Sequence, residues 1–110
     1  MSWRAYIVKK YVCEYGGSAF NYASCELYTL LTENEIAVFD NTTSDLPDKW
    51  EIRDVTGLKK LVKKLSQLPP GATCEHFSDA TFTNSYVVIV LSEWLKHVDK
   101  KSKVIRVHWF

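Results

Sequence analysis

Several features that mark particular classes of protein are missing from this sequence of 110 residues. Its longest uninterrupted apolar stretch, residues 86–91, has six residues, whereas a membrane-spanning helix needs about 20. The first ten residues lack the apolar core of a signal peptide. Only four glycines are present, and their spacing matches neither a dinucleotide-binding nor a P-loop motif. We therefore expect no membrane span, no signal peptide and no glycine-rich phosphate loop.

Cysteine is also scarce. Cys13, Cys25 and Cys74 form an odd number, and no two of them have the CxxC spacing. An odd count without paired spacing is more typical of free thiols in a reducing compartment than of a disulfide framework. Zinc sites usually show paired short spacings as well. We therefore predict a cytoplasmic protein with free, mostly buried thiols and with neither a metal nor a cofactor.

The net charge of the sequence is also small. It is only +1 at pH 7, which argues against a general polyanion-binding protein. The charge is nevertheless uneven, because residues 1–56 hold nine acidic and five basic residues, whereas residues 57–110 hold four acidic and nine basic ones. Such asymmetry fits two surfaces with different partners, two halves that attract each other, or ordinary solvated faces, and we favour the last.

The clearest structural pattern that is present lies in residues 54–70. Apolar side chains recur there at the three- and four-residue spacing of one helix face, with lysines on the opposite face. Asp54 or Thr56 can cap the start of this helix, and Pro69 with Pro70 ends it. The pattern predicts an amphipathic helix that packs on a sheet. Its apolar residues are Leu58, Leu61, Val62, Leu65 and Leu68, and its lysines are Lys59, Lys60, Lys63 and Lys64.

Two further segments fit either a helix or a strand. Residues 19–34 contain three closely spaced leucines that share a face only in a helix, so we prefer a helix there. Residues 84–100 begin with β-prone residues, but their apolar face continues without a break, and Thr83 or Asn84 can cap a helix. In that helix the apolar arc is wider than packing on one sheet requires, which suggests burial on two sides or a subunit contact.

Other segments have the composition of strands. The first is long, a double glycine beginning at Gly16 ends it, and Ser18 can cap the next helix. We predict one α+β domain over residues 1–110, with a mixed or antiparallel sheet of four or five strands and three helices, in the approximate order β–α–β–(β)–α–(β)–α–β. The predicted strands are residues 3–15, residues 35–40, residues 50–53 as a short edge strand, and residues 104–110.

One group of residues could form a catalytic or ligand-binding site. Cys74 and His76 would share a face in a strand, where a thiol and an imidazole could act as nucleophile and base. Together with His108 and the acidic residues of a turn-rich loop, they could form the site of a small enzyme or ligand-binding protein. A buried cysteine beside a surface histidine explains the pair more simply, and we favour that explanation. The acidic residues are Asp40, Asp45, Asp48 and Glu51.

Lysines offer a second possibility, because a lysine-faced helix can follow a nucleic-acid backbone. The same pattern is found on any solvated surface helix, so we rank nucleic-acid binding as an alternative. The candidate residues are Lys59, Lys60, Lys63, Lys64, Lys100, Lys101 and Lys103.

The preferred hypothesis is a non-catalytic protein-interaction module of the inhibitor, immunity or accessory type. No complete catalytic motif is present, and four tryptophans exceed what a small core requires, so some of them could be interface anchors. We expect an unknown protein partner and a homodimer. The candidate interface residues are Trp50, Ile89, Trp94 and Trp109.

Overall fold

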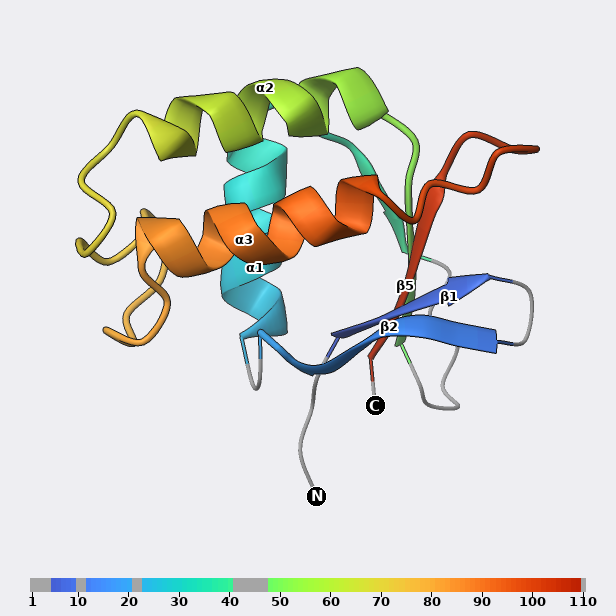
Figure 1. The fold of residues 1–110 in the computed structure, drawn as a ribbon, viewed down its shortest axis with the longest axis horizontal. Helices are drawn as coiled ribbons and strands as arrows, with labels where there is room; N and C mark the ends of the chain where they lie inside the picture. Colours follow the sequence, from blue (N-terminus) through green and yellow to red (C-terminus); the bar gives the residue numbers. More distant parts are fainter. Residues whose placement is uncertain (1–4, 10–11, 21–22, 41–47, 110) are drawn as a thin grey trace.

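A computed structural model describes residues 5–9, 12–20, 23–40 and 48–109. Three helices gather on one side of an antiparallel sheet, and α2 and α3 lie side by side in opposite directions (Figure 1). This confirms the predicted α+β class and the helical alternative for both ambiguous segments. The elements are β1 Ala5–Lys9, β2 Val12–Ala19, α1 Ser24–Glu33, β3 Val38–Asp40, β4 Asp48–Ile52, α2 Val55–Ser66, α3 Asn84–Leu95 and β5 Ile105–Trp109.

The sheet has the order β2-β1-β5-β4-β3, and each neighbouring pair is antiparallel. The last of these strands along the chain, β5, therefore occupies the centre. Val107 of β5 pairs with Ile7 on one side and with Trp50 on the other. The hairpin β1–β2 and the pair β3–β4 are thus held in one sheet through β5.

The two long helices begin where their capping residues predict. The Asp54 carboxylate accepts a hydrogen bond from the Gly57 backbone N–H at 2.8 Å, and the Thr83 hydroxyl accepts one from the Tyr86 N–H at 3.1 Å. A Cβ at Gly57 would lie 2.2 Å from the nearer Asp54 carboxylate oxygen, so the α2 cap in this geometry requires glycine. Both helices end before the predicted residues, α2 at Ser66 and α3 at Leu95.

The core contains two groups of aromatic side chains. Phe20 is buried, with ring centroids 5.6 Å from Trp94 and 5.7 Å from Tyr86. On the sheet side, Trp50 and Trp109 have centroids 4.8 Å apart. Apolar residues of α1, α2 and α3 fill the space between the groups, so that the helical layer and the sheet share one core.

Three predictions about the strands, and the predicted cap at Ser18, were wrong. Residues 3–15 do not form one strand, because Lys9 of β1 pairs with Val12 of β2 in a hairpin. Gly16 lies inside β2 beside a register irregularity, and the glycine-containing strand accommodates that irregularity instead of ending. Ser18 also lies in β2, and α1 begins after Ala23, which makes no side-chain cap.

The third wrong prediction concerns the strand at residues 50–53. It belongs to β4, which is not an edge strand, because β3 pairs with its outer side and β5 with its inner side. Trp50 and Ile52 face the core, so pairing on both sides completes their burial. The observed order of elements is therefore β–β–α–β–β–α–α–β. Among the described residues, no helix has the length and apolar character needed to cross a membrane.

Candidate functional site

Cys74 belongs to the loop between α2 and α3, and its side chain lies in the core. Only 1% of the residue is exposed, and its backbone N–H donates to the Phe82 carbonyl at 2.8 Å. Burial, followed by the nearby charge of Glu75, raises the pKa of the Cys74 thiol to about 11. The thiol is therefore protonated at neutral pH, whereas a nucleophilic cysteine needs a thiolate.

The other predicted members of a chemical site are not brought to Cys74 in the described part of the chain. His76 is exposed, with a backbone φ of 71°. Glu51 lies on β4, where it accepts a hydrogen bond from Arg53 at 2.7 Å. Within the described ranges, no three or more histidine, cysteine and acidic residues are grouped so that they could hold a metal ion. Residue 45 and the side chains of Asp40, Asp48 and His108 lie outside the described residues.

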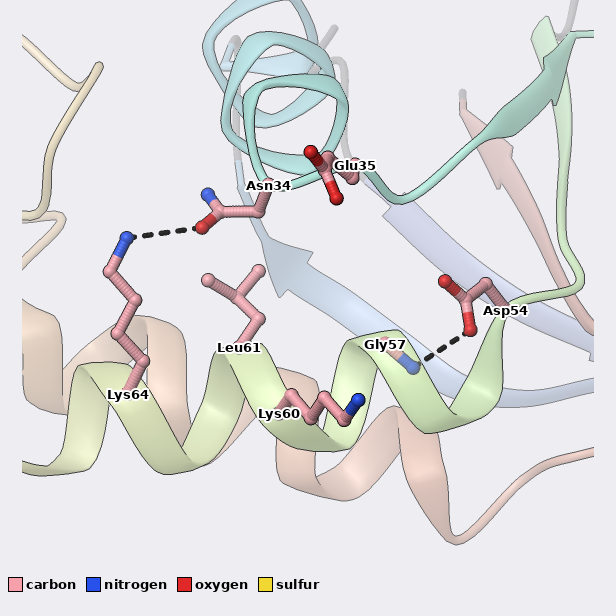
Figure 2. Close-up of a pocket in the computed structure, with 7 residues that line it drawn as sticks. All are labelled: Asn34, Glu35, Asp54, Gly57, Lys60, Leu61 and Lys64. Carbon is pink, nitrogen blue, oxygen red and sulfur yellow. Dashed lines mark hydrogen bonds between the residues drawn. The ribbon is translucent and has the colours of Figure 1, made fainter.

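A polar hollow of about 230 Å³ lies between the end of α1 and α2 (Figure 2). Lys64 donates to Asn34 at 3.1 Å and to the Glu75 carboxylate at 3.2 Å. Partial burial raises the pKa of Glu75, but hydrogen bonds from Lys64 and Asn34 outweigh that effect and leave it below its usual value. These contacts join α1, α2 and the following loop, so Lys64 has a structural role.

The remaining candidate lysines are exposed on two separate elements. None of them has an acidic partner among the described residues. Nucleic-acid binding through them stays a prediction. Lys59, Lys60 and Lys63 lie on α2, and Lys100, Lys101 and Lys103 lie in the turn between α3 and β5.

Three of the four candidate interface residues lie in the core, contrary to the expectation of exposed anchors. Trp94 and Trp109 have no exposed surface, and Trp50 is 5% exposed. The reason is that Trp50 and Trp109 pack against each other on the sheet side of the core, while Trp94 packs against Phe20. Only Ile89 offers appreciable surface, since 59% of it is exposed.

Ile89 is exposed on the outer side of α3, where Ser85, Ser92 and Glu93 lie within one helical turn of it. Beside it runs a shallow groove of about 160 Å³ between the end of α2 and the start of α3. Leu68 was predicted to be buried on the apolar face of α2, but it follows the last turn of that helix and is exposed. The groove lining has no charged side chain among the described residues, and consists of Leu65, Ser66, Leu68, Pro70, Ser85 and Val88. We call this groove together with Ile89 the α3 patch.

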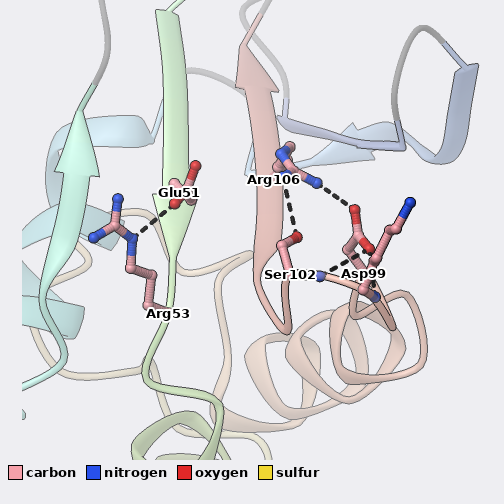
Figure 3. A network of polar contacts seen from close by, with 6 residues as sticks. Glu51, Arg53, Asp99, Ser102 and Arg106 are labelled. Atoms are coloured by element: carbon pink, nitrogen blue, oxygen red, sulfur yellow. Dashed lines mark hydrogen bonds and ion pairs between the residues drawn. The ribbon is translucent and has the colours of Figure 1, made fainter.

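A second hollow, of about 330 Å³, lies at the other end of α3, beside the turn that leads to β5. The Asp99 carboxylate organises this turn (Figure 3). It accepts hydrogen bonds from Arg106 at 2.5 Å and from the backbone N–H groups of Lys101 at 2.9 Å and Ser102 at 3.3 Å. These contacts, the Arg106 bond first among them, hold the pKa of Asp99 well below its usual value.

The sequence predicted Ile89 as an interface residue and a possible subunit contact on its helix, but not the groove beside it. It also predicted a role for the lysines of the basic turn, but not the hollow next to them. Comparison of the chain with models of protein families, with curated proteins and with solved structures found no match.

Proposed function

We propose that the protein is a non-catalytic protein-interaction module that associates with a second copy of itself through the α3 patch. The observation that supports this most strongly is the exposure of Ile89 beside an apolar groove. Large apolar side chains that project from a helix next to an uncharged hollow are typical of contact surfaces.

The arrangement suits a two-fold symmetric contact in particular. In such a contact the same surface is used by both subunits, so a projection and a recess must lie side by side on one face. Ile89 supplies the projection, and the groove that includes Val88 and Leu68 supplies the recess. No described charge lines the groove itself, so pairing over the groove would bury mainly apolar surface, and Glu93, one helical turn from Ile89, is already paired with Lys96.

A protein of the inhibitor, immunity or accessory type acts by contact alone, and a stable apolar surface is sufficient for that role. Both described cysteines are free thiols; Cys74 is buried as predicted, whereas Cys25 is exposed, contrary to the prediction of mostly buried thiols. A reducing, cytoplasmic setting would keep the exposed Cys25 thiol from forming disulfides.

The test is the oligomeric state of the Ile89→Asp variant. We expect the wild-type chain to dimerise and the substitution to weaken dimerisation by about 100-fold or more, because each dimer would bury two charged side chains in place of two apolar ones. Sedimentation equilibrium over a range of protein concentrations measures this. Phe39→Asp is the matched control, since Phe39 is also an exposed apolar residue but lies on β3. A monomeric wild-type chain, or equal dissociation of both variants, would refute the proposal.

A further inference from the structure

The hollow at the end of α3 combines an apolar floor with a basic rim. Leu95 and Val98 are partly buried side chains that pack against the core and form the floor. Lys96, Lys100 and Lys103 are exposed at its edge. A volume of about 330 Å³ is at the lower end of the range for small binding pockets.

The charges around this hollow do not cancel. Lys96 is paired with Glu93 at 2.8 Å, and Asp99 is paired with Arg106 at 2.5 Å. These two pairs are neutral overall. Lys100, Lys101 and Lys103 have no acidic partner in the described part of the chain, so the rim carries a local excess of positive charge.

The turn that carries these lysines is closed by its own hydrogen bonds. The Asp99 N–H donates to the Val104 carbonyl at 2.9 Å, and the Lys103 N–H donates to the Asp99 carbonyl at 2.7 Å. The side chain of Asp99 binds the backbone of the turn as well (Figure 3). The backbone of the turn is therefore held in place before any ligand arrives, which lowers the entropy cost of binding.

We infer that this hollow, which we call the basic hollow, binds an acidic peptide segment of a partner protein, with one apolar side chain on the floor and flanking carboxylates on the lysines. The apolar floor of the basic hollow favours a peptide with an apolar side chain over a nucleic acid. A single strand would need an aromatic platform for its bases, and the exposed aromatic residues of the described chain, Tyr28 and Phe39, lie on α1 and β3 instead.

This inference goes beyond self-association and does not depend on it, because the basic hollow uses residues other than those of the α3 patch. The probe is a fluorescein-labelled synthetic peptide with four acidic residues around one central leucine. Two comparison probes keep the charge but remove the leucine: the same peptide with glycine in its place, and a single-stranded oligonucleotide of equal charge. Fluorescence anisotropy with the full chain gives each affinity.

Lys103 can be replaced without destabilising the turn. Its backbone φ is 61°, in the left-handed region where glycine is the least strained residue. Lys103→Gly therefore removes the charge while leaving the turn equally stable or more stable, so weaker binding cannot be attributed to unfolding. Lys100→Gln is a second variant that removes a rim charge without altering the backbone. Lys59→Gln on α2 is the matched control, because Lys59 is an equally exposed lysine without an acidic partner.

We expect the leucine peptide to bind more tightly than either comparison probe. Lys103→Gly and Lys100→Gln should each weaken it by about 2–5-fold, and the double variant by about 10-fold, whereas Lys59→Gln should leave it unchanged. The Ile89→Asp variant should bind the peptide as the wild type does, so failure of self-association and failure of this inference are distinguishable. Absence of peptide binding, equal binding of the oligonucleotide or the glycine peptide, or an equal loss with Lys59→Gln would overturn the inference.

Discussion

The two faces of α3 differ in both composition and burial. The inner face, which includes Val87, Leu91 and Trp94, has no exposed surface and packs in the core. The outer face carries Ile89, the most exposed of the large apolar residues in the described chain. The other residues near Ile89 on the outer face are polar, among them Ser85, Ser92 and Glu93, so this one exposed apolar side chain takes no part in the core packing that attaches the helix. This difference suggests that stability and recognition can be changed separately in one helix.

Substitution on the inner face should have the largest effect on stability. Leu91→Ala removes a fully buried side chain and leaves a cavity, so we expect the free energy of unfolding to fall by about 2–5 kcal/mol. Urea denaturation followed by tryptophan fluorescence measures this. Val88→Ala on the partly buried side of the same helix is the control and should cost less. Equal losses for both variants would mean that the two faces do not differ as described.

The N-cap of α3 stabilises the helix that carries both faces. Thr83→Ala removes the hydroxyl that accepts from the Tyr86 N–H, so the free energy of unfolding should fall by about 1 kcal/mol. Thr83→Ser keeps the acceptor and should restore most of this loss. The measurement is again urea denaturation. If serine were no better than alanine, the hydrogen bond at the cap would not be the cause.

The turn after α3 should make stability depend on pH. The pKa of Asp99 is lower in the folded chain than in the unfolded chain, so its ionised form stabilises the fold above about pH 4, and this contribution is lost as the pH falls further. Thermal unfolding between about pH 5 and pH 2 should show a steeper loss for the wild type than for Asp99→Asn. Parallel curves for the two proteins would show that Arg106 does not favour the ionised carboxylate.

Substitution on the outer face should have the smallest effect on the stability of the monomer. Ile89→Asp changes a largely exposed side chain, so the free energy of unfolding, measured at a concentration where the wild type is monomeric, should stay within about 0.5 kcal/mol of the wild-type value. A loss as large as that expected for Leu91→Ala would show that the outer face also holds the fold together.

Local patterns in the sequence predicted much of the helical layer. At each start the sequence offered two candidate caps, Asp54 or Thr56 and Thr83 or Asn84, and in each case the first forms the hydrogen bond to a partner three residues away. The pairing of β1 with β2 was missed because the run of residues 3–15 contains no glycine, proline, asparagine or aspartate that would mark a division into two strands. Register irregularities beside glycine are set by strand pairing, which composition does not reveal.

The surfaces could be predicted only in part. The lysines of the basic turn were recognised, but the hollow also requires Leu95 and Val98 to lie beside them, and that depends on where α3 ends. The burial of Trp50 and Trp109 depends on contacts between β4 and β5, which are far apart in the sequence. Leu68 is exposed because α2 stops at Ser66, before the helical spacing would have turned that residue inward.

The central position of β5 affects when the sheet can be completed during synthesis of the protein. During synthesis every other described element leaves the ribosome before this strand does. Until residues 105–109 emerge, β1 and β4 each have one unpaired edge, and the indole of Trp50 lacks its neighbour Trp109. The five-stranded sheet can therefore be completed only after residues 105–109 are available to join its two halves.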